Sequence, residues 1–175
     1  MQNIISFLFY LSLILCLVYI GILFIYSFLL QKIKSGPNII PDKLPSVSVL
    51  VAARNEDQNI IDCLQALNNM QYTEGQIEIL IGNDQSTDCT QMQVEDFIKD
   101  KSKFKLFNLT GNEFPQTKGK ARVLAFLASQ AKGDYFLITD ADISVPEHWA
   151  ENMVAMMLNN RADMCGGTTN ITAEK

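Results

Sequence analysis

The sequence predicts an α/β fold with a mostly parallel sheet and flanking helices, preceded by one N-terminal transmembrane helix. The first thirty of the 175 residues carry no charged side chain, although the chain as a whole has 14 Lys and Arg and 19 Asp and Glu. After this leader, short apolar runs alternate with segments of helical spacing, which is the pattern of right-handed βαβ units. Polar side chains follow the apolar runs, at the position where α/β proteins bind their ligands.

The leader is interpreted as an uncleaved membrane anchor. Only Ser and Gly interrupt the apolar residues from Ile4 to Leu30, and a helix of that length rises roughly 40 Å, more than a bilayer core requires. A signal peptide is the alternative, but no basic residue precedes the run, whereas Lys32 and Lys34 follow it. These lysines favour a cytoplasmic remainder at the plasma (inner) membrane. We therefore predict an anchor over residues 1–31, a linker over 32–45 and one soluble domain over 46–175.

The soluble part opens with two strand–helix pairs. Val47–Ala52 is a β-branched run typical of a buried parallel strand. Asn55 follows as the expected start of a helix whose apolar residues recur at helical spacing: Ile60, Ile61, Leu64 and Leu67. Ile77–Ile81 is the second predicted strand. Ser86–Asp88 is then the predicted cap of a helix that carries Met92, Val94, Phe97 and Ile98.

Two further strands and helices follow. Phe104–Leu109 is the third predicted strand, and the helix after it carries Val123, Leu124, Phe126 and Leu127. Tyr135–Thr139 is the fourth strand. Pro146 occupies the first turn of a helix predicted to reach about Asn160, and Met164–Gly167 is expected to begin a fifth strand.

Charge and cysteine content exclude several classes of protein. The net charge of −5, with an isoelectric point near 4.8, argues against a nucleic-acid-binding protein, because phosphate contacts need a basic face. The four cysteines stand far apart, without a CxxC pair or a neighbouring histidine. We interpret them as packing thiols in a reducing compartment rather than as a zinc site or a disulfide framework.

A candidate site emerges where the strands end. Asp84 follows the second strand, and Asp140 and Asp142 follow the fourth; the cations in the neighbouring loops are Arg54, Lys118 and Lys120. Two carboxylates one residue apart can share a divalent cation, which needs hard oxygen ligands, and such a cation neutralises a diphosphate leaving group. The glycine-rich phosphate loops GxGxxG and GxxxxGK[ST] are absent. The alternatives are a solvated role for the two lysines and a salt bridge for Arg54.

Three motifs in order resemble the family 2 glycosyltransferases. They are SVLVAARNEDQNIIDCLQAL, EILIGNDQSTDCT and KGKARVLAFLASQAKGDYFLITDADI, within about residues 45–167. The resemblance implies a GT-A (Rossmann-like) fold and an inverting transfer of sugar from a nucleotide-diphosphate sugar, with a UDP-sugar favoured. It also implies a divalent cation, Mn²⁺ or Mg²⁺. The anchor makes a lipid-linked or glycan acceptor a sensible expectation.

The resemblance implies a role for each matching residue. Asn55 and Glu56 are similar to the Asn-Glu pair near the nucleoside, and Asp84 resembles the aspartate that contacts uracil or ribose. Lys118 and Lys120 resemble the lysine loop that faces the donor. Asp140 and Asp142 resemble the DxD motif, which meets the ribose and the metal-bound diphosphate.

The match has two departures. Asn83 replaces the first aspartate of the family's DDGSTD-like turn, and Gln85 stands where the family commonly has glycine.

The family's catalytic base belongs to a later acidic motif, so we expect it beyond Lys175 and interpret the chain as the N-terminal part of a longer protein, inactive by itself. A nucleotidyltransferase and a non-catalytic nucleotide-binding or interaction domain are the alternative functions.

Overall fold

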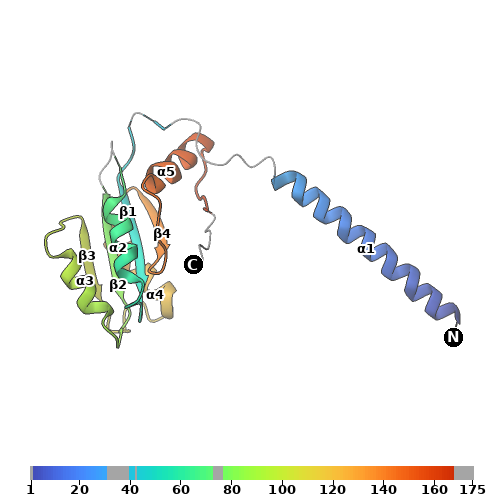
Figure 1. Cartoon of the computed structure of the whole chain (residues 1–175), viewed down its shortest axis with the longest axis horizontal. Helices are drawn as coiled ribbons and strands as arrows, with labels where there is room; N and C mark the ends of the chain where they lie inside the picture. The colour runs from blue at the N-terminus through green and yellow to red at the C-terminus, as the bar shows by residue number, and fades with distance from the viewer. Residues whose placement is uncertain (1, 31–39, 42, 73–76, 168–175) are drawn as a thin grey trace, which may run out of the picture. The chain divides into compact units, whose positions relative to one another are not determined.

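The computed structural model describes residues 2–30, 40–41, 43–72 and 77–167 (Figure 1). The chain divides into two compact units, Met1–Gly36 and Pro37–Lys175, and each is described by itself. Most of the predicted linker, including Lys32 and Lys34, lies outside the described residues. The predicted boundaries of anchor, linker and soluble domain therefore stay predictions.

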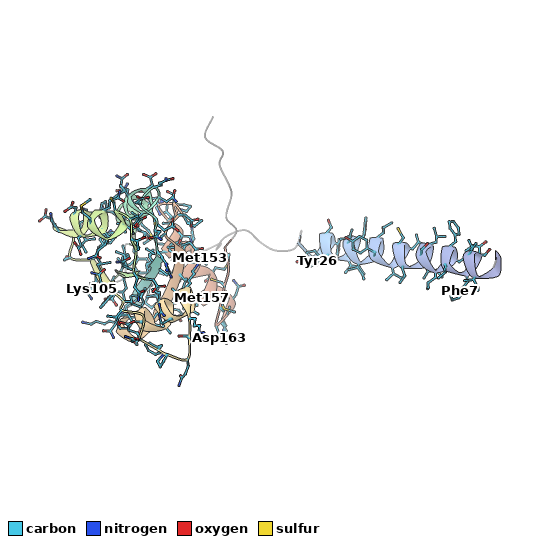
Figure 2. All side chains as sticks on the ribbon, turned by 90° about the horizontal axis from the view of Figure 1, so that it is seen from below. Phe7, Tyr26, Lys105, Met153, Met157 and Asp163 are labelled. Carbon is cyan, nitrogen blue, oxygen red and sulfur yellow. The ribbon has the colours of Figure 1, made fainter. Side chains whose placement is uncertain are left out.

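The described part of the N-terminal unit is a single long helix, α1 (Gln2–Leu30). Side chains such as Phe7 and Tyr26 project outward from it (Figure 2), and each is more than 60% exposed. An 18-residue window within Ile4–Phe28 has a mean hydropathy of 2.7, so the helix is long and apolar enough to cross a membrane. The predicted apolar helix is confirmed, whereas its membrane orientation stays a prediction.

The second unit contains a four-stranded parallel sheet with the order β3-β2-β1-β4 (Figure 1). Its strands are β1 (Val47–Ala53), β2 (Ile77–Asn83), β3 (Phe104–Asn108) and β4 (Tyr135–Asp140). Its helices are α2 (Ile60–Asn69), α3 (Thr90–Ile98), α4 (Gly119–Gln130) and α5 (Trp149–Asn160). The alternation predicted from sequence is confirmed, and so is the α/β class with a parallel sheet.

Helices cover both faces of the sheet, which explains why the central strands are apolar on both sides. On one face, Val49 and Val51 pack with residues of α2, α3 and α5. On the other face, Leu50 and Leu80 pack against Val123 and Leu127 of α4. The chain crosses from one edge of the sheet to the other through α4, because β3 and β4 lie on opposite sides of the β2–β1 pair. The strand order therefore reverses beside β1, where ligands of such sheets bind.

Two local predictions are wrong. Asn55 does not start a helix: its φ of 55° is left-handed, and α2 begins only at Ile60. Met164–Gly167 has no strand conformation, because it does not pair with β4. A groove of about 920 Å³ lies between this segment and β4 and is lined also by Met153 and Met157 of α5 (Figure 2). Among the described residues, the outer edge of β4 thus has no strand partner.

Gly133, just before β4, should be the glycine least tolerant of a side chain. A Cβ here would meet the backbone of Val47 and Ser48, and the Gly133 N–H also donates to Ser48 Oγ at 2.9 Å. We expect Gly133→Ala to lower the free energy of unfolding by about 2–3 kcal/mol, the cost of overpacking beside a rigid strand. Urea denaturation of the whole protein in detergent would measure this. Gly166→Ala is the control, because its Cβ would meet nothing within 4 Å; equal losses in both variants would contradict the explanation.

Candidate functional site

The ends of β1, β2 and β4 and the start of α4 surround one pocket of about 340 Å³ at the carboxyl edge of the sheet. Its charged lining residues are Arg54, Glu56, Asp84, Lys120, Asp140 and Asp142. The pocket lies at the point where the strand order reverses. The fold thus brings together charged residues that are up to 88 positions apart in sequence, from Arg54 to Asp142.

Asp84 is the buried acidic group of the pocket. Its side chain is only 5% exposed and lies between two guanidinium groups, Arg122 on Oδ1 at 2.5 Å and Arg54 on Oδ2 at 3.8 Å. A buried carboxylate requires such partners, because desolvation of an unpaired charge is expensive. Arg54 therefore makes the salt bridge that was one of its two predicted roles, and it lines the pocket as well.

Arg122 is a residue of the site that was not predicted from the sequence. This side chain is 14% exposed, and its Nη1 also donates to Gly111 O at 3.0 Å. Its Nε is buried without a hydrogen-bond partner among the described residues. One signal was available, because a cation in the first turn of a helix is disfavoured by the helix dipole. The position of Arg122 near the start of α4 therefore indicated an acidic partner.

The two aspartates after β4 form the other side of the pocket. Asp140 is half-exposed and forms an ion pair with Lys120 of α4, while Asp142 is exposed. Below them, Cys63 Sγ donates to Asp140 O at 3.6 Å. Burial, followed by the charges of Asp142 and Asp140, raises the pKa of the Cys63 thiol to about 12. The thiol therefore stays protonated near neutral pH and acts as a packing and hydrogen-bonding group.

Two predicted site residues do not line the pocket. Lys118 is exposed and extended at the N-cap of α4, one residue before Gly119, which does line it. Asn55 uses its side-chain oxygen to accept from Thr87 N at 2.8 Å. Its neighbour Glu56 contributes to the lining and accepts from Asn59 Nδ2 at 3.1 Å.

The two departures from the family's turn have structural roles. Gln85 adopts a φ of 59°, a region in which glycine has no steric penalty and other residues are strained by about 1 kcal/mol. Its side chain donates to Thr110 O, which offsets that strain. Asn83 is buried, and its Nδ2 donates to Asn108 Oδ1 at 2.9 Å while its Oδ1 accepts from Ser86 N at 3.2 Å. An aspartate could accept the second bond but could not donate the first.

The donor set of the pocket fits a divalent cation that completes its coordination with substrate. No three His, Cys, Asp or Glu residues of the described ranges cluster closely enough to hold a metal alone. Asp140 and Asp142 nevertheless supply hard oxygen atoms to one pocket. Mg²⁺-type sites commonly use one or two carboxylates plus phosphate oxygens and water. The residues present therefore suit a cation that arrives with a diphosphate.

Comparison with known proteins agrees with this geometry. Glycosyl transferase family 2 matches residues 48–174. A probable glycosyltransferase of Bacillus subtilis, YdaM, is 33% identical over 119 residues, which are 67% of this chain and 27% of that protein. The beta-monoglucosyldiacylglycerol synthase of Nostoc is 34% identical over 106 residues, 61% of this chain and 22% of that protein. The chain thus spans about a quarter of the length of these relatives.

Solved structures extend the likeness to the fold. The mannosyltransferase PcManGT of Pyrobaculum calidifontis, solved with GDP-Man and Mn²⁺, has a TM-score of 0.64 and 25% identity, over 77% of this chain and 39% of that one. TarS 1–349 of S. aureus, solved with UDP-GlcNAc, has a TM-score of 0.55 and 23% identity, over 74% of this chain and 37% of that one. The GT-A expectation is therefore confirmed. With a family match over most of its length, the chain belongs to glycosyl transferase family 2.

Proposed function

We propose that the whole protein transfers a sugar from a nucleotide-diphosphate sugar to an acceptor hydroxyl, with inversion and with the help of a divalent cation. The observation that carries this proposal is one pocket that places a buried carboxylate, Asp84, across from the exposed pair Asp140 and Asp142. Family membership and the nucleotide sugars bound to PcManGT and TarS support it. We retain a UDP-sugar as the favoured donor and a lipid-linked or glycan acceptor.

Each pocket residue then has a chemical task. Asp84 accepts a hydrogen bond from the nucleobase or ribose, because its pairing with Arg122 keeps the carboxylate in a fixed orientation. Asp140 would accept a hydrogen bond from the ribose, and Asp142 together with Asp140 would hold Mn²⁺ or Mg²⁺. When bound, that cation neutralises the charge that develops on the leaving diphosphate. PcManGT, solved with Mn²⁺, supports this choice of cation.

Lys120 has a second task in this proposal. Its ammonium group pairs with Asp140 in the structure. A diphosphate in the pocket offers it a stronger partner, so Lys120 turns from Asp140 to a phosphate oxygen. Asp140 is thereby released for the ribose and the cation. Lys118 adds a longer-range attraction from the rim, since its side chain is exposed and outside the lining. The acceptor hydroxyl loses its proton to a base that we expect beyond Lys175.

The apolar helix α1 sets the proposed location. We propose that α1 anchors the protein in the plasma (inner) membrane as a single span, with the second unit cytoplasmic. The absence of charge over the first thirty residues supports a span, and the lysines that follow support this orientation. A cytoplasmic domain also suits cysteines that are free thiols throughout the described part of the chain.

The experiment is an assay of the whole protein in detergent with UDP-GlcNAc, UDP-glucose and GDP-mannose. We expect nucleoside diphosphate to be released from one of these donors in the presence of Mn²⁺. Removal of the metal with EDTA should reduce the rate at least about 100-fold, because leaving-group stabilisation by a cation contributes several kcal/mol. Added Mn²⁺ should restore the rate.

Two results would support the alternative functions instead. Pyrophosphate release from a nucleoside triphosphate and a sugar 1-phosphate would identify a nucleotidyltransferase. Tight binding of nucleoside diphosphate, without turnover of any donor across a broad set of acceptors, would identify a binding domain. A turnover rate that is unchanged by EDTA would contradict the metal-assisted mechanism.

A further inference from the structure

Asn55 ties the loop after β1 to the loop after β2. Its backbone N donates to Ser86 Oγ at 3.0 Å. Its side-chain Oδ1 accepts from Thr87 N at 2.8 Å and from Thr87 Oγ1 at 3.4 Å. One residue thus uses both its backbone and its side chain to hold a segment more than 30 positions away in sequence. We refer to these bonds, with the two described next, as the inter-loop clamp.

The next two residues of the β1 loop continue the clamp. Glu56 N donates to Thr90 Oγ1 at 2.8 Å, and Asp57 N donates to Asp88 Oδ2 at 3.2 Å. Desolvation would by itself raise the pKa of Asp88, but the hydrogen bonds from Thr90 and Asp57 lower it. Asp88 is therefore ionised at neutral pH, and its charge strengthens the hydrogen bonds that it accepts. Three consecutive backbone N–H groups of the loop after β1 thus donate to side chains of the loop after β2 and of Thr90, the first residue of α3.

The clamp requires an unusual backbone at Asn55. Its φ of 55° is left-handed, a conformation that asparagine, aspartate and glycine adopt most readily. Glycine would provide the conformation but no acceptor for Thr87. Alanine would provide neither. Asparagine and aspartate provide both, so the residue type at this position is restricted by two separate demands.

The clamp joins two neighbouring loops that both contribute to the lining of the pocket. Arg54 and Glu56 flank Asn55 and line the pocket, and Asp84 lines it from the end of β2. The contact between Arg54 and Asp84 is long, 3.8 Å, and Arg54 is 61% exposed, so this ion pair by itself does not fix the spacing. One backbone hydrogen bond, from Asp84 N to Ala53 O at 2.9 Å, joins the ends of β1 and β2. The clamp bonds are equally short and hold the residues that follow Ala53.

We propose that Asn55 is a positioning residue: it sets the distance between the Arg54–Glu56 segment and Asp84 and makes no contact with the donor itself. This inference rests on the proposed function, since the effect is on donor binding. It differs from the expectation that Asn55 lies against the nucleoside. A direct ligand would use its side-chain Nδ2 as a donor, whereas the clamp uses Oδ1 as an acceptor. The two roles respond differently to aspartate.

The test compares Asn55→Asp, Asn55→Gly and Asn55→Ala in the whole protein in detergent, with Asn69→Ala as the control at an exposed helix position. Calorimetry would measure binding of UDP-GlcNAc and GDP-mannose in the presence of Mn²⁺. We expect the dissociation constant to rise by less than about threefold in Asn55→Asp and by about fivefold in Asn55→Gly, which loses both hydrogen bonds from Thr87. Asn55→Ala also loses the left-handed conformation, and we expect a rise of about 25-fold. The control variant, Asn69→Ala, should leave the dissociation constant unchanged.

Amide hydrogen exchange of the ligand-free protein gives a readout that does not depend on the donor. Peptides covering residues 84–90 should exchange at least about fivefold faster in Asn55→Gly and Asn55→Ala than in the unsubstituted protein or Asn55→Asp. Loss of binding in Asn55→Asp equal to that in Asn55→Gly would overturn the inference in favour of a direct contact. Unchanged exchange in Asn55→Ala would overturn it as well. An unsubstituted protein that binds no donor would overturn the proposed function, while the exchange result would still decide whether the clamp exists.

Discussion

An Asp142→Ala variant of the whole protein is expected to lose at least about 1000-fold in kcat/KM for sugar transfer. Asp142 is exposed at the mouth of the pocket, whereas its neighbour Asp140 is already engaged by Lys120. In the proposed mechanism, Asp142 is therefore the carboxylate that receives the divalent cation. Loss of a metal ligand removes several kcal/mol of leaving-group stabilisation, and each 1.36 kcal/mol corresponds to a tenfold change in rate. Initial rates with saturating Mn²⁺ would measure the effect.

Asp163→Ala is the matched control for this experiment. Asp163 is exposed, as Asp142 is, but it lines the groove beside β4 and not the pocket that contains Asp142. It should retain full activity and the same dependence on Mn²⁺. Turnover by Asp142→Ala with an unaltered Mn²⁺ requirement would show that the cation binds elsewhere, and the assignment of this carboxylate would then fail.

The second large effect is expected on stability, from Arg122→Met. This substitution leaves the buried carboxylate of Asp84 with Arg54 alone, a partner that is 3.8 Å away and largely exposed. Removal of one member of a buried ion pair costs about 3–5 kcal/mol, because the remaining charge stays desolvated. Since Arg122 is 14% exposed, we expect a loss of about 3 kcal/mol in the free energy of unfolding. Urea denaturation followed by circular dichroism would measure it.

Two further variants separate charge burial from loss of packing. Arg54→Met removes the exposed partner and should cost less than about 1 kcal/mol. The double variant Asp84→Asn with Arg122→Met removes the buried charge as well, so it should be more stable than Arg122→Met alone. A loss in Arg122→Met no larger than that in Arg54→Met would mean that Asp84 does not depend on Arg122.

The sequence allowed the class of fold to be predicted because the central strands are apolar on both faces, whereas the helices carry their apolar residues at helical spacing. Val49, Leu50 and Val51 cannot all face one layer, so a strand of this kind implies helices on both sides. The position of the pocket followed from the same reasoning, since aspartates directly after parallel strands must gather at one edge.

The remaining features depend on backbone geometry and on pairing that no local pattern reveals. Asn55 is an acceptable helix cap by residue type, and only its left-handed φ excludes that role. Arg122 reaches Asp84 because α4 crosses the sheet beside β1 and β2, which is a property of the topology and not of the residues around it. Gln85 is left-handed only because the turn after β2 demands it. The conformation of Met164–Gly167 depends on contacts and not on its own propensity.

The edge of β4 that pairs with no described strand has a practical consequence for aggregation of the protein. Phe136 is 48% exposed and Ile138 is 54% exposed, and they lie beside a row of backbone groups that pairs with no strand of the described residues. An uncovered edge of this kind is a template for intermolecular strand addition. A recombinant polypeptide limited to residues 40–167 would offer the same template on every copy. Its aggregation would then be governed by protein concentration rather than by detergent, even with the apolar helix α1 removed.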